Sequence, residues 1–193
     1  MQEVFLVCLC YLLGAIPFSY LFVRILKGFD IRKHGSGNVG STNVLRTAGK
    51  GVAVAALAGD LLKGVLAVWL GLHFGGEILA SICAIAAVVG HCWSAYLGFK
   101  GGKGVATTAG VILYLMPKIL LLLLIVFIVI VAISRYVSLA SISVAVLLPL
   151  MVYIFDKPNH LLIMSVMLTI LVIFQHRENI TRLWNGIEGK IGQ

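Results

Sequence analysis

Long hydrophobic runs, separated by short polar segments, follow one another along almost the whole chain. A helix needs about 20 mostly apolar residues to cross a bilayer, within a range of about 17 to 25. Seven segments are candidate spans, although 104–116 is short: 3–26, 51–73, 77–97, 104–116, 118–134, 138–155 and 160–175. Proline breaks a helix and lysine favours the interface, so we expect Pro117 and Lys118 to form a tight turn. A broken re-entrant pair over 104–134 is the alternative. The pattern predicts an all-α polytopic membrane protein.

The composition supports a membrane environment. Of the 193 residues, 61% are hydrophobic and only 11% are charged, whereas a soluble domain has about 25% charged residues. We therefore expect a single integral membrane domain, residues 1–193, with no separate soluble domain. The first ten residues include Glu3 but no basic residue, which argues against a signal peptide. We expect the four cysteines to be buried packing residues: Cys8, Cys10, Cys83 and Cys92.

The distribution of charge predicts the orientation. The net charge is +8, from 15 Lys and Arg against 7 Asp and Glu. With seven spans, the N-terminus outside and the C-terminus cytoplasmic, only Lys118 and Lys157 fall on the outer side, and Lys63 falls within a span. Twelve cations fall inside, as the positive-inside rule requires: Arg24, Lys27, Arg32, Lys33, Arg46, Lys50, Lys100, Lys103, Arg135, Arg177, Arg182 and Lys190. The excess also suits anionic lipids or phosphorylated substrates, and we expect no nucleic-acid partner.

The same topology collects the long polar segments on the cytoplasmic side. They span residues 30–50, 90–108 and 174–190, and a shorter one spans 135–141. The outer connections are short by comparison. If the protein carries out chemistry, we therefore expect it at the inner membrane surface.

The first polar segment contains the glycine spacing G-x-G-x-x-G within "HGSGNVG". A dinucleotide-binding fingerprint needs a preceding hydrophobic strand and a following soluble helix, and neither is predicted here. Closely spaced glycines still allow backbone N–H groups to converge on an anion. Nearby Asn38, Thr42 and Asn43 add hydrogen-bonding groups, and Arg46 offers a forked partner for phosphate.

A second glycine-rich loop, "FKGGKG", carries Lys103 and leads into a predicted helix. It is not a Walker A loop, because Leu97 occupies the position of its first glycine and Gly104 follows Lys103. A lysine before a helix N-terminus is nevertheless a suitable anion site. Two such loops on one side suggest one large anionic site or two phosphates, although turns and the positive-inside rule alone also account for each loop.

Several other polar residues are candidates for chemistry. His176, Asn179 and Arg182 recur at three-residue spacing, which places them on one face of a helix continuing from the last span. Asp60 and Lys63 are ionisable residues within a span and can pair at i, i+3. They either brace the helix bundle or reach a substrate cavity.

Three segments closely resemble the three motifs of the PlsY family: "GSGNVGSTNVLRTAGK", "GHCWSAYLGFKGGKGVAT" and "HRENITRLWNGIE". These are bacterial integral-membrane acyl-phosphate:glycerol-3-phosphate acyltransferases. "YVSLAS" and "GDLLKG" also resemble that family, so the resemblance covers the whole chain. One departure is Ser94, where the second motif usually has proline.

The resemblance implies transfer of an acyl group from acyl phosphate to the 1-hydroxyl of glycerol 3-phosphate, giving lysophosphatidic acid and phosphate. It implies neither acyl-CoA nor acyl carrier protein as donor, no cofactor and no metal. We expect a monomer in the bacterial cytoplasmic (inner) membrane, in contact with membrane lipid, with its active site at the cytoplasmic face. The expected catalytic residues are Lys103, Arg46, His176, Asn179 and Ser141. The expected substrate-binding residues are Ser36, Gly37, Asn38, Gly40, Thr42, Asn43, Gly101, Gly102, Gly104 and His91, although His91 is equally compatible with a satisfied interfacial histidine. Either His176 or a substrate phosphate accepts the hydroxyl proton.

Three other classes of protein fit less well. A transporter would place polar residues near the bilayer midplane, often with inverted repeats; only Asp60 and Lys63 are central here, and we find no repeat. An acyltransferase with a soluble donor would carry His-x-x-x-x-Asp, and none of the five histidines has Asp five residues on. A non-catalytic scaffold would not need three polar segments on one face.

Overall fold

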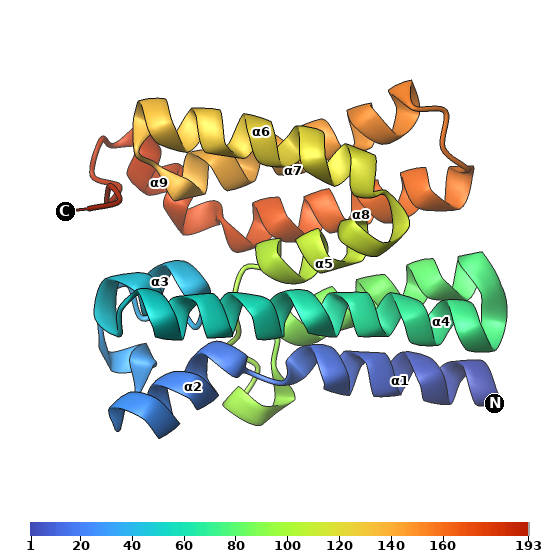
Figure 1. Ribbon diagram of the computed structural model, residues 1–193, viewed down its shortest axis with the longest axis horizontal. Coiled ribbons are helices and arrows are strands. Elements are labelled where there is room, and N and C mark those ends of the chain that lie inside the picture. The colour runs from blue at the N-terminus through green and yellow to red at the C-terminus, as the bar shows by residue number, and fades with distance from the viewer. Residues whose placement is uncertain (193) are drawn as a thin grey trace. The chain divides into compact units, whose positions relative to one another are not determined.

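The computed structural model describes residues 1–192, and within that range it is helical and contains no strand (Figure 1). The prediction of an all-α chain is confirmed, and the lack of any strand beside the first glycine-rich loop excludes a dinucleotide-binding βαβ unit there. The chain divides into two compact units, Met1–Tyr114 and Leu115–Gln193. The first contains α1 (Gln2–Ala15), α2 (Phe18–Lys27), η1 (Ile31–Lys33), α3 (Ser41–Thr47), α4 (Lys50–Cys92), η2 (Ala95–Leu97) and nearly all of α5 (Val105–Leu115). The second contains α6 (Pro117–Ser134), α7 (Val137–Ile154), α8 (Asn159–Gln175) and α9 (Arg177–Trp184).

The first predicted span is broken into α1 and α2. The break falls at Ile16, whose backbone is extended (φ −57°, ψ 118°). Pro17 explains it, because proline lacks an N–H group and disfavours helical geometry at the preceding residue. The predicted span 3–26 is therefore interrupted, although Gln2–Lys27 as a whole is long and apolar enough to cross a membrane.

Helix α4 combines two predicted spans. It reverses direction at Gly76, which has φ 76° and ψ −167° (Figure 1). Residues with a β-carbon rarely adopt this conformation, so the glycine permits the reversal. The two arms correspond to the predicted 51–73 and 77–97, but the second arm ends at Cys92, five residues early.

Helix α5 packs closely on the first arm of α4. A β-carbon added at Gly110 would collide with the carbonyl oxygen of Leu61. Small residues allow this close approach in membrane helices, where van der Waals packing drives association. The side of α1 that faces α4 is also buried, with Leu6 and Cys10 packed against Cys83. Cys8, by contrast, is exposed, so the expectation of burial was wrong for this cysteine.

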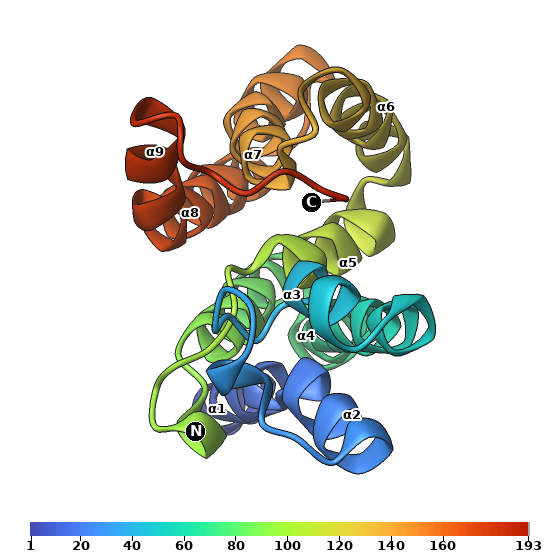
Figure 2. The ribbon, with the colours of Figure 1, turned by 90° about the vertical axis from the view of Figure 1, so that its left-hand side faces the viewer.

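In the second unit, α7 packs against both α6 and α8 (Figure 2). Pro117 is the first residue of α6 and Met116 is its N-cap. The predicted Pro117–Lys118 turn is therefore displaced, because a proline at the first helical position loses no hydrogen bond. The chain bends by 58° between α8 and α9, so the third polar segment does not continue the last span as a straight helix.

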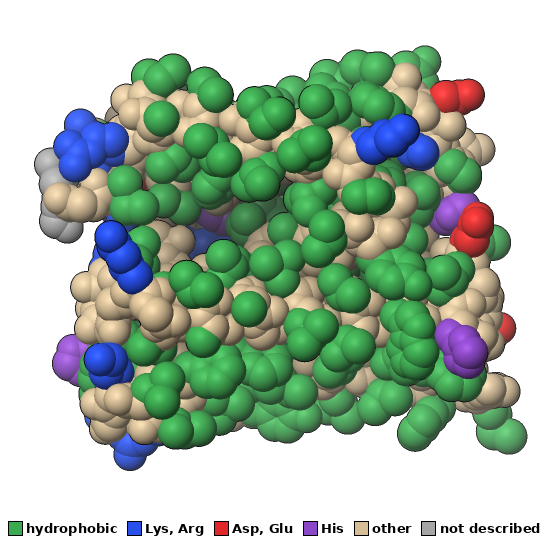
Figure 3. Space-filling view, viewed as in Figure 1, with side chains coloured by type: hydrophobic (Ala, Val, Ile, Leu, Met, Phe, Trp, Pro, Cys, Tyr) green, Lys and Arg blue, Asp and Glu red, His purple; other side chains and the backbone are tan. Residues whose placement is uncertain are grey.

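The surfaces suit a bilayer. On the face shown in Figure 3, hydrophobic side chains cover most of the helices, and charged and histidine side chains lie towards helix ends. Among residues 1–192, four stretches are long and apolar enough to cross a membrane: Gln2–Lys27, Lys50–Leu97, Pro117–Ser134 and Val137–Ile154. The bent pair α8–α9 gives a fifth.

Candidate active site

Asn43 organises the first glycine-rich loop. Its Oδ1 accepts a hydrogen bond from the Ser36 N–H (3.0 Å), and its Nδ2 donates to the carbonyls of His34 and Asn38 (3.0 Å each). A β-carbon at Gly35 would collide with the same Oδ1. Asn43 is only 3% exposed and both of its Nδ2 hydrogens are used within the loop, so it supports the loop, and its contact with substrate stays a prediction.

The outward-facing groups of this loop are the ones available to an anion. Gly35 and Gly37 have φ of 59° and 72°, and they flank Ser36, which is exposed. The Ser36 and Gly37 N–H groups already donate within the loop, to Oδ1 of Asn43 and to the His34 carbonyl, so the loop presents side chains to an anion rather than a backbone nest. Arg46, in the last turn of α3, is also exposed. Asn38, Gly40 and Thr42 are half-buried. The loop thus offers neutral donors together with one guanidinium.

The second glycine-rich loop is attached to the end of α4. The Gly101 N–H donates to the Cys92 carbonyl (3.1 Å), and the Gly102 N–H donates to the His91 carbonyl (3.0 Å). Lys103 is half-buried and lies two residues before α5 begins. The first N–H groups of a helix have no partner within it and attract anions. The loop therefore combines an ammonium group, Gly104 and a helix N-terminus.

Ser94 has a specific contact that proline could not make. Its Oγ donates a 2.5 Å hydrogen bond to the Ala15 carbonyl at the end of α1. The departure from the family motif thus ties the start of this loop to the break between α1 and α2.

Beneath the second loop lies a buried cluster of three ionisable side chains. Nζ of Lys63 is 2.8 Å from Oδ1 of Asp60, which confirms the predicted pair, and Nδ1 of His91 is 3.4 Å from the same oxygen. His91 is 7% exposed. Because its Nδ1 faces Asp60 and its Nε2 lies against Gly102, the structure favours the alternative of a satisfied histidine, and we assign His91 no substrate contact.

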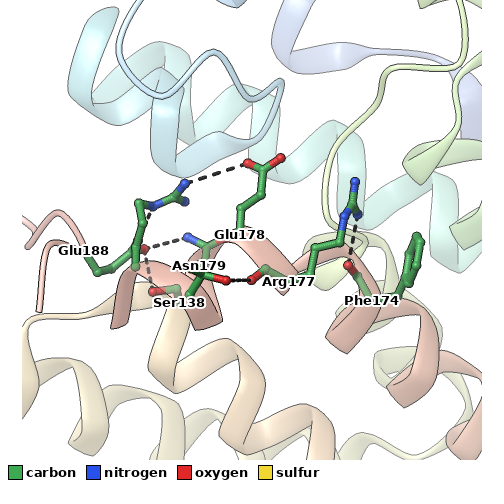
Figure 4. A network of polar contacts seen from close by, with 8 residues as sticks. Ser138, Phe174, Arg177, Glu178, Asn179 and Glu188 are labelled. Atoms are coloured by element: carbon green, nitrogen blue, oxygen red, sulfur yellow. Dashed lines mark hydrogen bonds and ion pairs between the residues drawn. The ribbon is translucent and has the colours of Figure 1, made fainter. Parts of the chain in front are cut away.

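In the second unit, the Glu188 carboxylate collects three donors (Figure 4). Its Oε1 accepts from Nδ2 of Asn179 (2.6 Å) and Oγ of Ser138 (2.7 Å), and its Oε2 accepts from Nε of Arg182 (2.7 Å). Burial alone would raise the pKa of Glu188, but these hydrogen bonds and the Arg182 charge outweigh it and lower the pKa. Asn179 and Arg182 share a helix face, as predicted.

Sequence reasoning missed Glu188 and Ser138. Glu188 follows α9 in a segment without regular secondary structure, and 50 residues separate it from Ser138. The only signal was its place in the third motif, where it is the one acidic residue after α9.

His176 and Ser141 are both buried near helix ends. Nδ1 of His176 lies 2.7 Å from the Val172 carbonyl. This contact places a proton on Nδ1, so in the neutral ring the lone pair is on Nε2. Oγ of Ser141 donates to the Val137 carbonyl (2.8 Å). Of the expected site residues, Lys103 and Arg46 therefore belong to the first unit, and Ser141, His176 and Asn179 belong to the second.

Comparisons with known proteins place these features in a family. The family model described as glycerol-3-phosphate acyltransferase matches residues 4–186. A glycerol-3-phosphate acyltransferase of Syntrophomonas wolfei subsp. wolfei is 56% identical over 99% of this chain and 98% of its own. One of Moorella thermoacetica, glycerol-3-phosphate acyltransferase 2, is 46% identical over 95% of this chain and 94% of its own.

Solved structures agree with the sequence relatives. PlsY (YgiH), an integral membrane glycerol 3-phosphate acyltransferase, matches with a TM-score of 0.94 and 39% identity in its glycerol 3-phosphate form. Its lysophosphatidic acid form matches with a TM-score of 0.93 and the same identity. Both matches cover 100% of this chain and 96% of the other. The chain belongs to the PlsY family of integral membrane glycerol-3-phosphate acyltransferases.

Proposed function

We propose that this protein transfers the acyl group of an acyl phosphate to the 1-hydroxyl of glycerol 3-phosphate. The products are 1-acyl-glycerol 3-phosphate (lysophosphatidic acid) and inorganic phosphate, in the first step of phospholipid synthesis. The observation that carries the proposal is the full-length match to a protein solved with the acceptor, glycerol 3-phosphate, and with the product, lysophosphatidic acid. The resemblance of the three motifs to acyl-phosphate-dependent enzymes supports the choice of donor.

The reaction is a direct transfer. The 1-oxygen of glycerol 3-phosphate attacks the acyl carbon, a new ester C–O bond forms, and the anhydride C–O bond to phosphate breaks. The hydroxyl proton passes to a phosphate oxygen of one of the two substrates. Because a carboxylic–phosphoric anhydride is already activated, positioning of the reactants and stabilisation of developing charge suffice. No covalent enzyme intermediate is needed.

Each unit contains residues with a proposed role. Lys103 and Arg46 stabilise phosphate and developing oxyanion charge, because both are cations beside glycine-rich loops. Asn179, held by Glu188, and Ser141 orient the acceptor. Ser36, Gly37, Asn38, Gly40, Thr42, Gly101, Gly102 and Gly104 complete the proposed binding groups.

For the proton, we propose that a phosphate oxygen is the acceptor, because a phosphate monoester has a second pKa of about 6. Nε2 of His176 then accepts a hydrogen bond and orients a hydroxyl group. The alternative is that Nε2 itself takes the proton.

The proposed topology brings both substrates to one surface. It has seven spans, an outer N-terminus and a cytoplasmic C-terminus, in the bacterial inner membrane, with the whole chain acting as one monomeric domain. The donor's acyl chain then remains in the inner leaflet, while glycerol 3-phosphate arrives from the cytosol. The cation distribution along the sequence supports this orientation.

The test is phosphate release by purified protein in detergent or lipid. We would mix the protein with palmitoyl phosphate, add glycerol 3-phosphate, and use palmitoyl-CoA as the control donor. We expect phosphate and lysophosphatidic acid only from acyl phosphate plus acceptor, and neither from Lys103→Ala. Folded protein that binds glycerol 3-phosphate but transfers no acyl group from acyl phosphate would refute the proposal.

A further inference from the structure

The buried cluster of Asp60, Lys63 and His91 has no part in the proposed reaction. Lys63 and Asp60 have side chains that are 1% and 2% exposed, and their neighbours along the first arm of α4 are mostly apolar. Burying an ion pair carries a large desolvation cost, and an intramembrane ionisable residue is a candidate for function by default. The cluster therefore requires an explanation in terms of what it contacts.

The cluster contacts two segments of backbone without regular secondary structure. Nζ of Lys63 donates a 2.9 Å hydrogen bond to the Ile16 carbonyl, at the break between α1 and α2. His91 lies against the loop that carries Lys103, since a β-carbon at Gly102 would collide with its Nε2. The Gly102 N–H also donates to the His91 carbonyl. The ring of His91 is thus held at one end by Asp60 and touches the loop at the other.

The space between these groups is small. The three side chains of the cluster line a cavity of about 10 Å³, together with Gly101 and the backbone around Ile16. A cavity of that size has room for about one water molecule. The His91 ring therefore cannot tilt far without displacing either Asp60 or the loop.

We propose that Asp60, acting through the His91 ring, positions the glycine-rich loop that carries Lys103, and that Lys63 fixes the same cluster to the broken helix at Ile16. The three are positioning residues, and none contacts substrate. The kinetic consequence rests on the proposed function, in which Lys103 stabilises phosphate. Displacing a catalytic group by about 1 Å can lower a rate by about 100-fold, so a ring that fixes the loop has a measurable effect.

Two variants separate positioning from general stability. His91→Asn places an amide where Nδ1 lies, which keeps a donor towards Asp60 but removes the ring edge beneath Gly102. The double variant Asp60→Leu with Lys63→Met replaces the ion pair by apolar side chains of similar volume, an exchange that is often neutral or stabilising. Leu79→Ala is the control, because Leu79 is buried in the same helix but about 18 Å along the axis from His91.

The experiment measures kcat, KM for both substrates and hydrogen exchange of the peptide covering 98–104, each on the full chain in detergent. For His91→Asn and for the double variant we expect unfolding temperatures close to that of the unsubstituted protein. We also expect a fall of about 100-fold in kcat/KM and faster exchange confined to that peptide. Leu79→Ala should lower the unfolding temperature and leave kcat/KM and loop exchange unchanged.

Two results would overturn the inference. One is normal kcat/KM and normal loop exchange in both test variants, which would show that the cluster only stabilises helix packing. The other is an equal loss of kcat/KM in Leu79→Ala, which would assign the effect to instability. If the unsubstituted protein transfers no acyl group, the proposed function fails, and loop exchange alone then decides the inference.

Discussion

Replacing Glu188 by glutamine tests whether this carboxylate holds Asn179 in place. A glutamine has one acceptor oxygen where glutamate has two, so at least one of the bonds from Ser138, Asn179 and Arg182 must become a contact between two donors. Hydrogen bonds to charged groups contribute about 1.5–3 kcal/mol each. We expect the free energy of unfolding to fall by about that amount, which corresponds to roughly 3 to 12 °C in unfolding temperature for a chain of this size.

The activity of Glu188→Gln should fall further than its stability alone explains. Asn179 Nδ2 is fixed by a 2.6 Å bond to Oε1 of Glu188, and a shift of about 1 Å in a substrate-orienting group can cost about 100-fold. We would measure kcat/KM by phosphate release at a temperature where the variant is fully folded. A kcat/KM equal to that of the unsubstituted protein would refute the assignment of Asn179 as an orienting group held by Glu188.

Glu178→Gln is the matched control. It is the same chemical change beside the same arginine, but the Glu178 side chain is 75% exposed and 3.8 Å from Nη1 of Arg182. Exposed pairs contribute only about 0–1 kcal/mol. We expect little change in unfolding temperature or kcat/KM. Equal losses in the two variants would show that reduced negative charge near Arg182, rather than the loss of the buried acceptor, is responsible.

The contribution of Glu188 to the free energy of unfolding should depend on pH. Its pKa in the folded protein lies below the ordinary value of 4.5, so the folded state binds the proton less readily than the unfolded state does. The stabilisation is therefore complete above about pH 4.5 and is lost as pH falls below that value. The difference in unfolding temperature between the unsubstituted protein and Glu188→Gln should shrink over that range.

Three further substitutions test other parts of the molecule. Asn43→Ala should remove three loop hydrogen bonds, lower the unfolding temperature and raise KM for a phosphate substrate; unchanged KM in the phosphate-release assay would contradict a role for Asn43 in shaping the loop. Gly110→Leu should destabilise the first unit by about 3 kcal/mol or more, because the side chain would meet the Leu61 carbonyl in a tightly packed interface. An unfolding temperature equal to that of the unsubstituted protein, measured by fluorescence, would contradict that packing. His176→Gln should keep kcat within about tenfold at saturating substrate if phosphate is the proton acceptor, whereas a loss of about 100-fold or more with normal binding would make His176 the base.

Much of the helical architecture follows from hydrophobic run length alone. The predicted 118–134 and 160–175 correspond to α6 (Pro117–Ser134) and α8 (Asn159–Gln175) within one residue. Backbone interruptions inside apolar sequence were harder to place. Pro17 lies within a continuous hydrophobic run, so hydropathy gives no sign of the break, which depends on the missing N–H and on a partner for the Ile16 carbonyl. That partner, Lys63, lies 47 residues away.

The site was predictable in residue type but less so in role. The glycine pattern correctly marked two irregular loops, and the i, i+3 spacing correctly paired Asp60 with Lys63. Asn43 was expected to contact substrate because asparagine beside a glycine-rich loop is a plausible phosphate ligand. Its side chain hydrogen-bonds to backbone groups five, seven and nine residues away, a supporting role that was not predicted. Sequence spacing does not reveal such bonds, because they depend on how the loop closes.

Asn43 and Glu188 explain how exposed loops can be ordered enough for catalysis. Fixing one residue's backbone costs about 1–2 kcal/mol in conformational entropy, and an exposed loop gains little from hydrophobic burial. In each unit this cost is offset by one largely buried side chain with several hydrogen bonds. Asn43 and Glu188 have three partners each at 3.0 Å or less. Because the loops are ordered before substrate binds, binding energy is not spent on ordering them. Substitution of Asn43 or Glu188 should therefore lower kcat/KM by disordering a loop, even though neither side chain is assigned a contact with the reacting atoms.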